Sequence, residues 1–292
     1  MKYLLRGAHI GPQMAVVIDE ARYESLSNAR KTLVDAGAFE ERYELLLSNY
    51  TTFEMFCAEV SLKGSNELDL RYEKWARTIS EANRHAINFL TTTRLYRDQV
   101  KGGFKHIDLN EPFKHQAKRL LGEAAEKDDI FKFVEAFRNH VQHVAFAVHG
   151  LKGRPKGAPL LEHTLVYCKK ERLAEDPRFS ADDLGLLDDN IDLLSMFRGY
   201  MATMSRIHIA LRKQVQKACD EARAAIQQAK EDYIQAQPAS ERASHSAVGL
   251  TACLSTDDRV VNPVTLMLDW DDARVALAQK NSRPITLPEV SA

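Results

Sequence analysis

Apolar residues recur every three or four positions along most of the chain, a pattern typical of helices that pack along one face. In the first half the pattern predicts helices over residues 18–36, 39–62, 66–100, 112–128 and 130–149. In the second half it predicts one very long helix over residues 180–237, which Pro238 ends. Weaker patterns indicate strands over residues 163–173 and 264–268 and a short helix over residues 271–280. We therefore expect a mostly α fold, a helical bundle with one very long helix in its C-terminal half and a small mixed tail.

The same pattern suggests three parts, which are an N-terminal extension (1–38), a helical domain (39–237) and a C-terminal tail (238–292). At about 1.5 Å per residue the helix over 180–237 would be roughly 80 Å long, more than the diameter of a small domain. It therefore bends, breaks or pairs with a second helix. The apolar residues expected at a contact with a second copy are Leu187, Ile191, Leu194 and Met201. The alternative is a hairpin within a monomer.

Composition restricts the class of protein. The 292 residues are 45% apolar and 28% charged, which is ordinary for a globular protein, and the formal net charge is -1. No global positive field attracts nucleic acid, so any contact with phosphate needs a local patch. The four cysteines occur singly, which favours buried thiols in a reducing compartment. The N-terminus lacks the apolar core of a signal peptide and no segment reaches the roughly 18 apolar residues of a membrane span, so we expect a cytoplasmic protein without membrane contact.

The stretch FRNHVQHVAFAVHG, residues 137–150, combines histidines and an arginine with an apolar pattern. On a helix over 130–149, an arc roughly 100° wide is apolar and should face the core. Its members are Val134, Phe137, Val141, Val144, Ala145 and Val148. The polar residues fall in a second arc roughly 140° wide, with His140 at its border. Its members are Glu135, Arg138, Asn139, Gln142 and His143.

Arginine, an amide and histidine on one rigid face suit a phosphodiester whose own ribose 2′-hydroxyl attacks the phosphorus. Arg138 would stabilise charge on the phosphorus, and His143 would move protons near neutral pH. Asn139, one turn before His143, would orient the imidazole or a phosphate oxygen. This chemistry requires no metal and no other cofactor. The alternative is an ordinary solvated helix face, with Arg138 paired to Glu135.

The string RNHVQH resembles the motif of the HEPN superfamily, in which a polar residue follows an arginine and a histidine stands five positions after that arginine. The matching residues are Arg138, Asn139 and His143, on a late helix of an expected bundle. The segment EANRHAINFLTTTRLYRD, with Asn83, Arg84 and Asn88, is similar to the long, polar-studded second helix of such bundles. The resemblance covers about residues 39–150, and the long helix and the tail lie outside it.

The resemblance implies a metal-independent endoribonuclease, often part of a toxin–antitoxin or anti-phage system. It also implies a homodimer in which two motif helices face each other and form one composite site. Such a nuclease would be conditional, with a neutralising or activating protein partner. Some members of the superfamily have lost catalysis, so a catalytically inert helical interaction module is the alternative.

Other candidates are weaker. Lys152, Arg154 and Lys156 in the loop LKGRPKG, together with Gln142, could bind RNA phosphates, although a solvated loop explains the lysines and arginine equally well. The aspartates of DWDDAR, residues 269–274, suit helix capping better than a metal site. We expect Asp188, Asp189 and Asp192 to form a solvated helix face. We expect His163 and His208 to be structural.

Overall fold

The computed structural model describes residues 2–8, 14–66, 71–153, 164–238, 242, 247–256 and 259–287. Arg154, Lys156 and His163 lie outside the described residues. The fold is mostly helical, with one long helix in the C-terminal half and small sheets, so the expected fold class is confirmed at this level. No helix in these ranges is both long enough and apolar enough to cross a membrane.

The helices are α1 (Glu20–Asn66), α2 (Tyr72–Gln99), the 3-10 turn η1 (Val100–Gly102), α3 (Phe113–Lys127), α4 (Asp129–His143), α5 (Lys170–Leu173), α6 (Ala181–Gly185), α7 (Leu193–Ala236) and α8 (Asp269–Lys280). The strands are β1 (Lys2–Arg6), β2 (Val16–Ile18), β3 (Gly150–Lys152), β4 (Leu165–Lys169), β5 (Asn190–Asp192), β6 (Thr251–Thr256) and β7 (Arg259–Thr265). The helices expected over 66–100, 112–128 and 271–280 correspond to α2, α3 and α8. The strand expected over 163–173 corresponds to β4. Strand β7 overlaps the start of the strand expected over 264–268.

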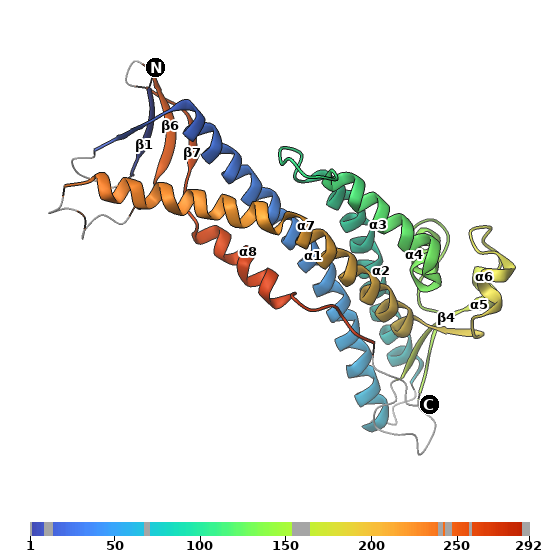
Figure 1. Ribbon diagram of the computed structural model, residues 1–292. Helices are drawn as coiled ribbons and strands as arrows, with labels where there is room; N and C mark the ends of the chain where they lie inside the picture. Colours follow the sequence, from blue (N-terminus) through green and yellow to red (C-terminus); the bar gives the residue numbers. More distant parts are fainter. Residues whose placement is uncertain are drawn as a thin grey trace. The chain divides into compact units, whose positions relative to one another are not determined.

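The chain forms two compact units, and the division cuts across the expected one. Unit 1 contains Met1–Glu41, Gly102–Lys114 and Ala210–Ser282, and unit 2 contains Arg42–Lys101, His115–Ile209 and Arg283–Ala292. In unit 1 an antiparallel sheet has the strand order β2-β1-β6-β7. Strand β1 pairs along its whole length with β6, with Leu4 opposite Cys253. Figure 1 shows the two strands side by side. The N-terminal segment and the tail therefore share one sheet and are not separate appendages.

Helix α1 continues through Gly37, where the sequence predicted a break. A side chain at Gly37 would meet only Trp270 of α8, at 3.9 Å, so the position is close to its neighbour but not strained. The Arg30 guanidinium lies 3.7 Å from the centre of the Trp270 ring. This packing of α1 against α8 offsets the roughly 1 kcal/mol that a helical glycine costs.

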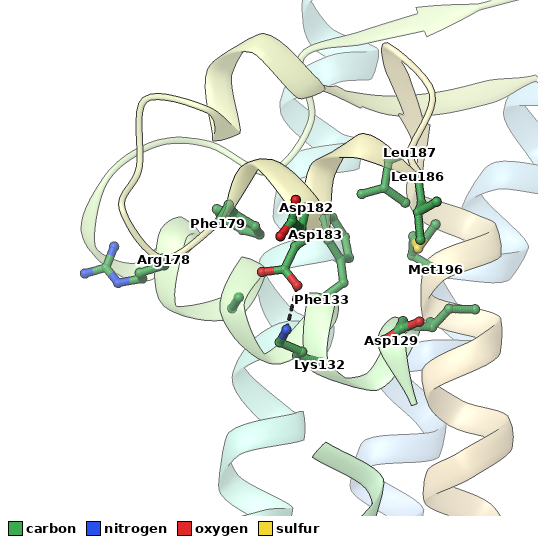
Figure 2. Close-up of a pocket in the computed structure, with 12 residues that line it drawn as sticks. Asp129, Lys132, Phe133, Arg178, Phe179, Asp182, Asp183, Leu186, Leu187 and Met196 are labelled. Atoms are coloured by element: carbon green, nitrogen blue, oxygen red, sulfur yellow. Dashed lines mark hydrogen bonds and ion pairs between the residues drawn. The ribbon is translucent and has the colours of Figure 1, made fainter. Parts of the chain in front are cut away.

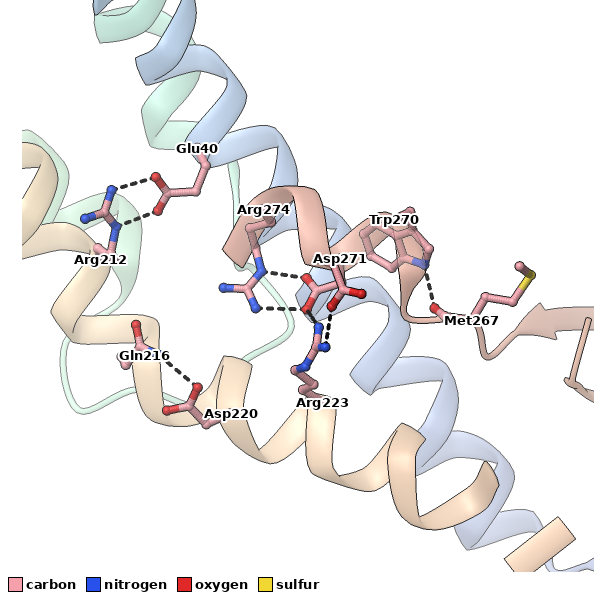
Figure 3. A network of polar contacts seen from close by, with 10 residues as sticks. Glu40, Arg212, Gln216, Asp220, Arg223, Met267, Trp270, Asp271 and Arg274 are labelled. Carbon is pink, nitrogen blue, oxygen red and sulfur yellow. Dashed lines mark hydrogen bonds and ion pairs between the residues drawn. The ribbon is translucent and has the colours of Figure 1, made fainter. Parts of the chain in front are cut away.

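Buried ion pairs join the helices of unit 1, as Figure 3 shows. Arg212 of α7 donates two hydrogen bonds of 2.6 Å to the Glu40 carboxylate, and both side chains are nearly inaccessible to solvent. Asp271 accepts from Arg223 of α7 and from Arg274, one turn along α8. The N-cap residue of α8 is Leu268 and the helix has no side-chain cap hydrogen bond, so the capping role expected of the DWDDAR aspartates is wrong. Among the described residues, no group of three or more His, Cys, Asp or Glu side chains could hold a metal ion.

In unit 2, aromatic side chains from α1, α2, α4 and α7 form the core. Phe197 lies 5.0 Å from Phe53 and 4.6 Å from Phe89, between ring centres, and Phe131 stacks on Tyr200 at 4.7 Å. His208 is fully buried, with its Nδ1 2.8 Å from the Tyr96 hydroxyl, which confirms its structural role. The second sheet, β3-β4-β5, belongs to the same unit.

The long helix begins thirteen residues later than predicted, because a capping box at Ser180 starts the short helix α6 and the chain then passes through β5. Asp192 caps α7 by accepting from the Leu194 N–H and the Ser195 hydroxyl, so it is not part of a solvated helix face. Ile191, Leu194 and Met201 are at most 2% exposed within the single chain. They are therefore not free for the expected contact with a second copy.

Candidate functional site

Helix α4 ends at His143, although the apolar pattern predicted a helix to residue 149. The Asn83 side chain of α2 accepts from the Val148 N–H at 2.8 Å and donates to the Val148 carbonyl at 3.1 Å. These two bonds replace the ones that Val148 would make in a helix. Residues 144–149 therefore form a loop, with Ala147 and Val148 buried and Val144 and Phe146 exposed. Asn83 positions the segment that follows the motif.

Arg138 is buried, with 6% of its surface exposed, whereas the sequence predicted it on a solvated face. Its guanidinium donates to Gln142 Oε1, and its Nε has no partner among the described atoms. Burial lowers the pKa of Arg138, as does the charge of Arg94. Glu135 pairs with Arg97 and accepts from the Tyr200 hydroxyl at 2.8 Å, so the alternative pairing of Glu135 with Arg138 is also wrong. Helices α2 and α7 cover this side of α4.

Because Arg138 is buried, we expect Arg138→Ala to destabilise unit 2 by about 2 kcal/mol, the usual scale for losing a packed, hydrogen-bonded polar side chain. Urea denaturation followed by circular dichroism measures this change. Arg119→Ala, at a half-exposed arginine of α3, is the matched control and should change stability by less than about 0.5 kcal/mol. Equal stability of the two variants would contradict the buried position.

An open groove of about 770 Å³ lies where α4 ends. Gln142 and His143, which are both exposed, line the groove, and so does the buried His140. The loop adds Val144, Phe146 and His149, α2 adds Ile87, and the segment after β4 adds Arg172 and Glu175. The half-buried Asn139 and the buried Arg138 are not among the residues that line the groove.

His149 is held as the neutral imidazole. Burial lowers its pKa, and so do the nearby charges of Arg172 and Lys169. Its Nδ1 accepts from the Lys169 N–H at 3.1 Å, so the ring proton is on Nε2. His149 can therefore donate a hydrogen bond to an anion, although it does not hold a positive charge.

The groove also contains Phe146, His149 and Arg172, which the sequence did not predict as site residues. The sequence pattern placed Phe146 and His149 on a helix, and Arg172 had no motif. The groove does bring His143 and Gln142 together as expected. Lys152 is exposed at the end of β3 and does not line the groove.

A second hollow, of about 200 Å³, lies between α4 and α6 (Figure 2). Its lining is mainly apolar, with Phe133 and Phe179 on one side and Leu187 and Met196 on the other. The Lys132 ammonium donates to Asp183 Oδ1 at 2.5 Å at this hollow. None of the candidate site residues lines it, so we place the candidate site at the groove.

Comparisons with known proteins give no matching family model, no matching curated protein and no matching solved structure.

Proposed function

We propose that the groove at the end of α4 binds single-stranded RNA and cleaves it without a metal, through attack by the ribose 2′-hydroxyl. The observation that carries this proposal is a set of three groups that line the groove, which are an exposed imidazole (His143), a cation (Arg172) and an exposed aromatic ring (Phe146). Imidazole transfers protons near neutral pH, arginine binds phosphate, and aromatic rings stack on unpaired bases. Together they match the three parts of a ribonucleotide.

In this proposal the motif residues have different roles. His143 transfers protons, and Arg172 with the Nε2–H of His149 holds the phosphate oxygens. Arg138 fixes the Gln142 amide one turn away and so acts as a positioning residue. Asn139 lies one turn before His143 and orients it or a phosphate oxygen. Two lysines and an arginine that follow α4 in the sequence, Lys152, Lys156 and Arg154, would attract the RNA backbone.

Phe146 provides a test of RNA binding that does not depend on catalysis. Its side chain is 69% exposed, so Phe146→Ala should leave the fold intact. Loss of one stacked base costs about 1–3 kcal/mol, so we expect RNA binding to weaken about 5- to 150-fold. Fluorescence anisotropy with a labelled single-stranded RNA, in a His143→Ala background, measures it. Phe146→Tyr is the control and should bind as well as the parent; equal binding by Phe146→Ala would argue against stacking.

The resemblance to HEPN proteins extends the proposal to a homodimer with the motif helices near the two-fold axis. It also suggests a conditional toxin or anti-phage effector in the cytoplasm, with a neutralising or activating protein partner. A composite site in a dimer would supply a base on one side of the phosphorus and an acid on the other. Light scattering at micromolar concentration tests the dimer.

The competing proposal is an inert helical interaction module. The burial of Arg138 and its bond to Gln142 favour it, because this guanidinium is not free to bind a phosphate. Incubation of the purified protein with mixed RNA in EDTA separates the two. Fragments that carry a 2′,3′-cyclic phosphate and a 5′-hydroxyl support the ribonuclease. Intact RNA, with protein of confirmed fold, supports the module.

A further inference from the structure

His140, one of the residues that line the groove, forms a buried pair with Asp176. His140 Nδ1 is 2.7 Å from Asp176 Oδ2, and each side chain is 1% exposed. Asp176 also accepts from the Arg178 N–H at 3.0 Å and from its guanidinium at 2.9 Å. Burial alone would raise the pKa of Asp176, but these hydrogen bonds lower it below the usual value, so the carboxylate stays ionised. An ionised carboxylate fixes the proton of a neutral imidazole on Nδ1.

The other ring nitrogen of His140, Nε2, is buried and has no hydrogen-bond partner among the described atoms. With the proton on Nδ1, Nε2 carries a lone pair and can only accept. A buried acceptor without a partner is unfavourable, so such an atom in a native protein requires an explanation. The rings of Phe137 and Phe179 flank the imidazole, with ring centres 6.4 and 6.0 Å away, and cannot supply a donor.

His140 lines the groove together with His143, His149 and Arg172. Residue His140 therefore belongs to the hollow where the proposed substrate would lie, while its Nε2 atom is shielded from solvent in the free protein. The free protein buries Nε2, so substrate binding has to open the wall of the groove at this point. Catalytic hydrogen bonds commonly tighten only in the complex with substrate.

We propose that His140 Nε2 accepts the ribose 2′-hydroxyl of the substrate and serves as the general base of the reaction. This inference rests on the proposed ribonuclease function, and it deepens it by naming the group that distinguishes RNA from DNA. DNA has no hydroxyl at this position, so it would leave the acceptor unsatisfied.

The proton transfers balance within one chain. The 2′-hydroxyl proton passes to His140 Nε2 as the 2′-oxygen forms a bond to phosphorus. The bond from phosphorus to the 5′-oxygen breaks, and the leaving oxygen takes a proton from the His143 imidazolium. The positive charge that appears on His140 lies beside the Asp176 carboxylate, which stabilises it. One protomer thereby supplies a base and an acid, so cleavage does not need two copies of His143.

Ring nitrogen signals of the full-length, ¹⁵N-histidine-labelled wild-type protein test the proposal directly. The probes are uridine 3′-monophosphate and 2′-deoxyuridine 3′-monophosphate, each added until the His143 signals stop changing. We expect His140 to show a protonated Nδ1 and an unprotonated Nε2 in the free protein. The ribonucleotide should shift the Nε2 signal upfield, as acceptance of a hydrogen bond does, and the deoxyribonucleotide should not. His140→Gln assigns the signals, and its RNA cleavage should fall about 10²-fold or more.

Two results would overturn the inference while leaving RNA cleavage intact. One is an Nε2 signal that neither nucleotide moves while the His143 signals respond, which would mean that the buried atom serves only the fold. The other is an equal shift with both nucleotides, which would exclude the 2′-hydroxyl as the donor. Failure of the proposed function looks different, because no RNA is then cleaved by the wild-type protein and neither probe moves any groove signal, and the inference fails with it.

Discussion

His143→Ala is expected to lower RNA cleavage by about 10²-fold or more, the usual effect of removing a general acid or base. The residue is exposed at the last position of α4, so the variant should fold like the wild type. His143 belongs both to the sequence motif and to the lining of the groove. The remaining cleavage would come from substrate binding by Arg172 and from the other groove histidines.

The measurement is the initial rate of cleavage of a short fluorescent RNA in EDTA, with enzyme in excess. His115→Ala is the matched control, because His115 is exposed on α3 and outside the groove, and it should cleave at the wild-type rate. Products of the residual reaction should still carry 2′,3′-cyclic phosphates. A His143→Ala protein that cleaves as fast as His115→Ala would show that the activity belongs to another site or to a contaminant.

The position of His143 was predictable from the sequence, but the surroundings of the motif were not. An arc drawn around α4 assumes that one face meets the core and the other meets water. Here α2 and α7 both pack on α4, so Arg138 is buried near Arg97 and Tyr200 although it lies on the polar arc. A helical periodicity contains no information about how many neighbours a helix has.

The end of α4 could not be predicted for a related reason. No glycine or proline stops the pattern after His143, and the helix ends because Asn83 takes the backbone groups of Val148. That contact joins residues 65 positions apart in sequence, which local pattern does not encode. Arg172 could not be predicted for the same reason, because it lines the groove from the short helix α5, far from His143 in the sequence.

Local signals did succeed where they are strong. Glycines around residue 102 separate α2 from α3, and alternating apolar residues mark β4. At Gly37 the rule failed, because a single glycine is a weak helix breaker when a large side chain such as Trp270 packs against it. The polar contact of His140 could not be predicted from the sequence either, because its partner Asp176 belongs to a loop without a recognisable motif.

Unit 1 provides the largest expected effect on stability, at the buried pair of Glu40 and Arg212. Removal of one partner of a buried ion pair typically costs about 3–5 kcal/mol, because the remaining charge stays buried without compensation. The Glu40 and Arg212 side chains are 3% and 12% exposed, and Arg212 also donates to the Asn281 carbonyl at 2.8 Å. We therefore expect Glu40→Ala to lower the free energy of unfolding of unit 1 by about 3–5 kcal/mol.

Urea denaturation followed by the fluorescence of Trp270, in a Trp75→Phe background, reports on unit 1. The control in the same unit is Glu221→Ala, whose partner Lys217 is 3.7 Å away and 89% exposed, and it should change stability by less than about 0.5 kcal/mol. A double variant, Glu40→Leu with Arg212→Met, removes both charges and should recover most of the loss, because no unpaired charge remains. If Glu40→Ala were as stable as Glu221→Ala, the pair would be solvated in the protein. If the double variant were less stable than Glu40→Ala, the loss would come from packing or from the Asn281 contact, and the buried charge would not be its cause.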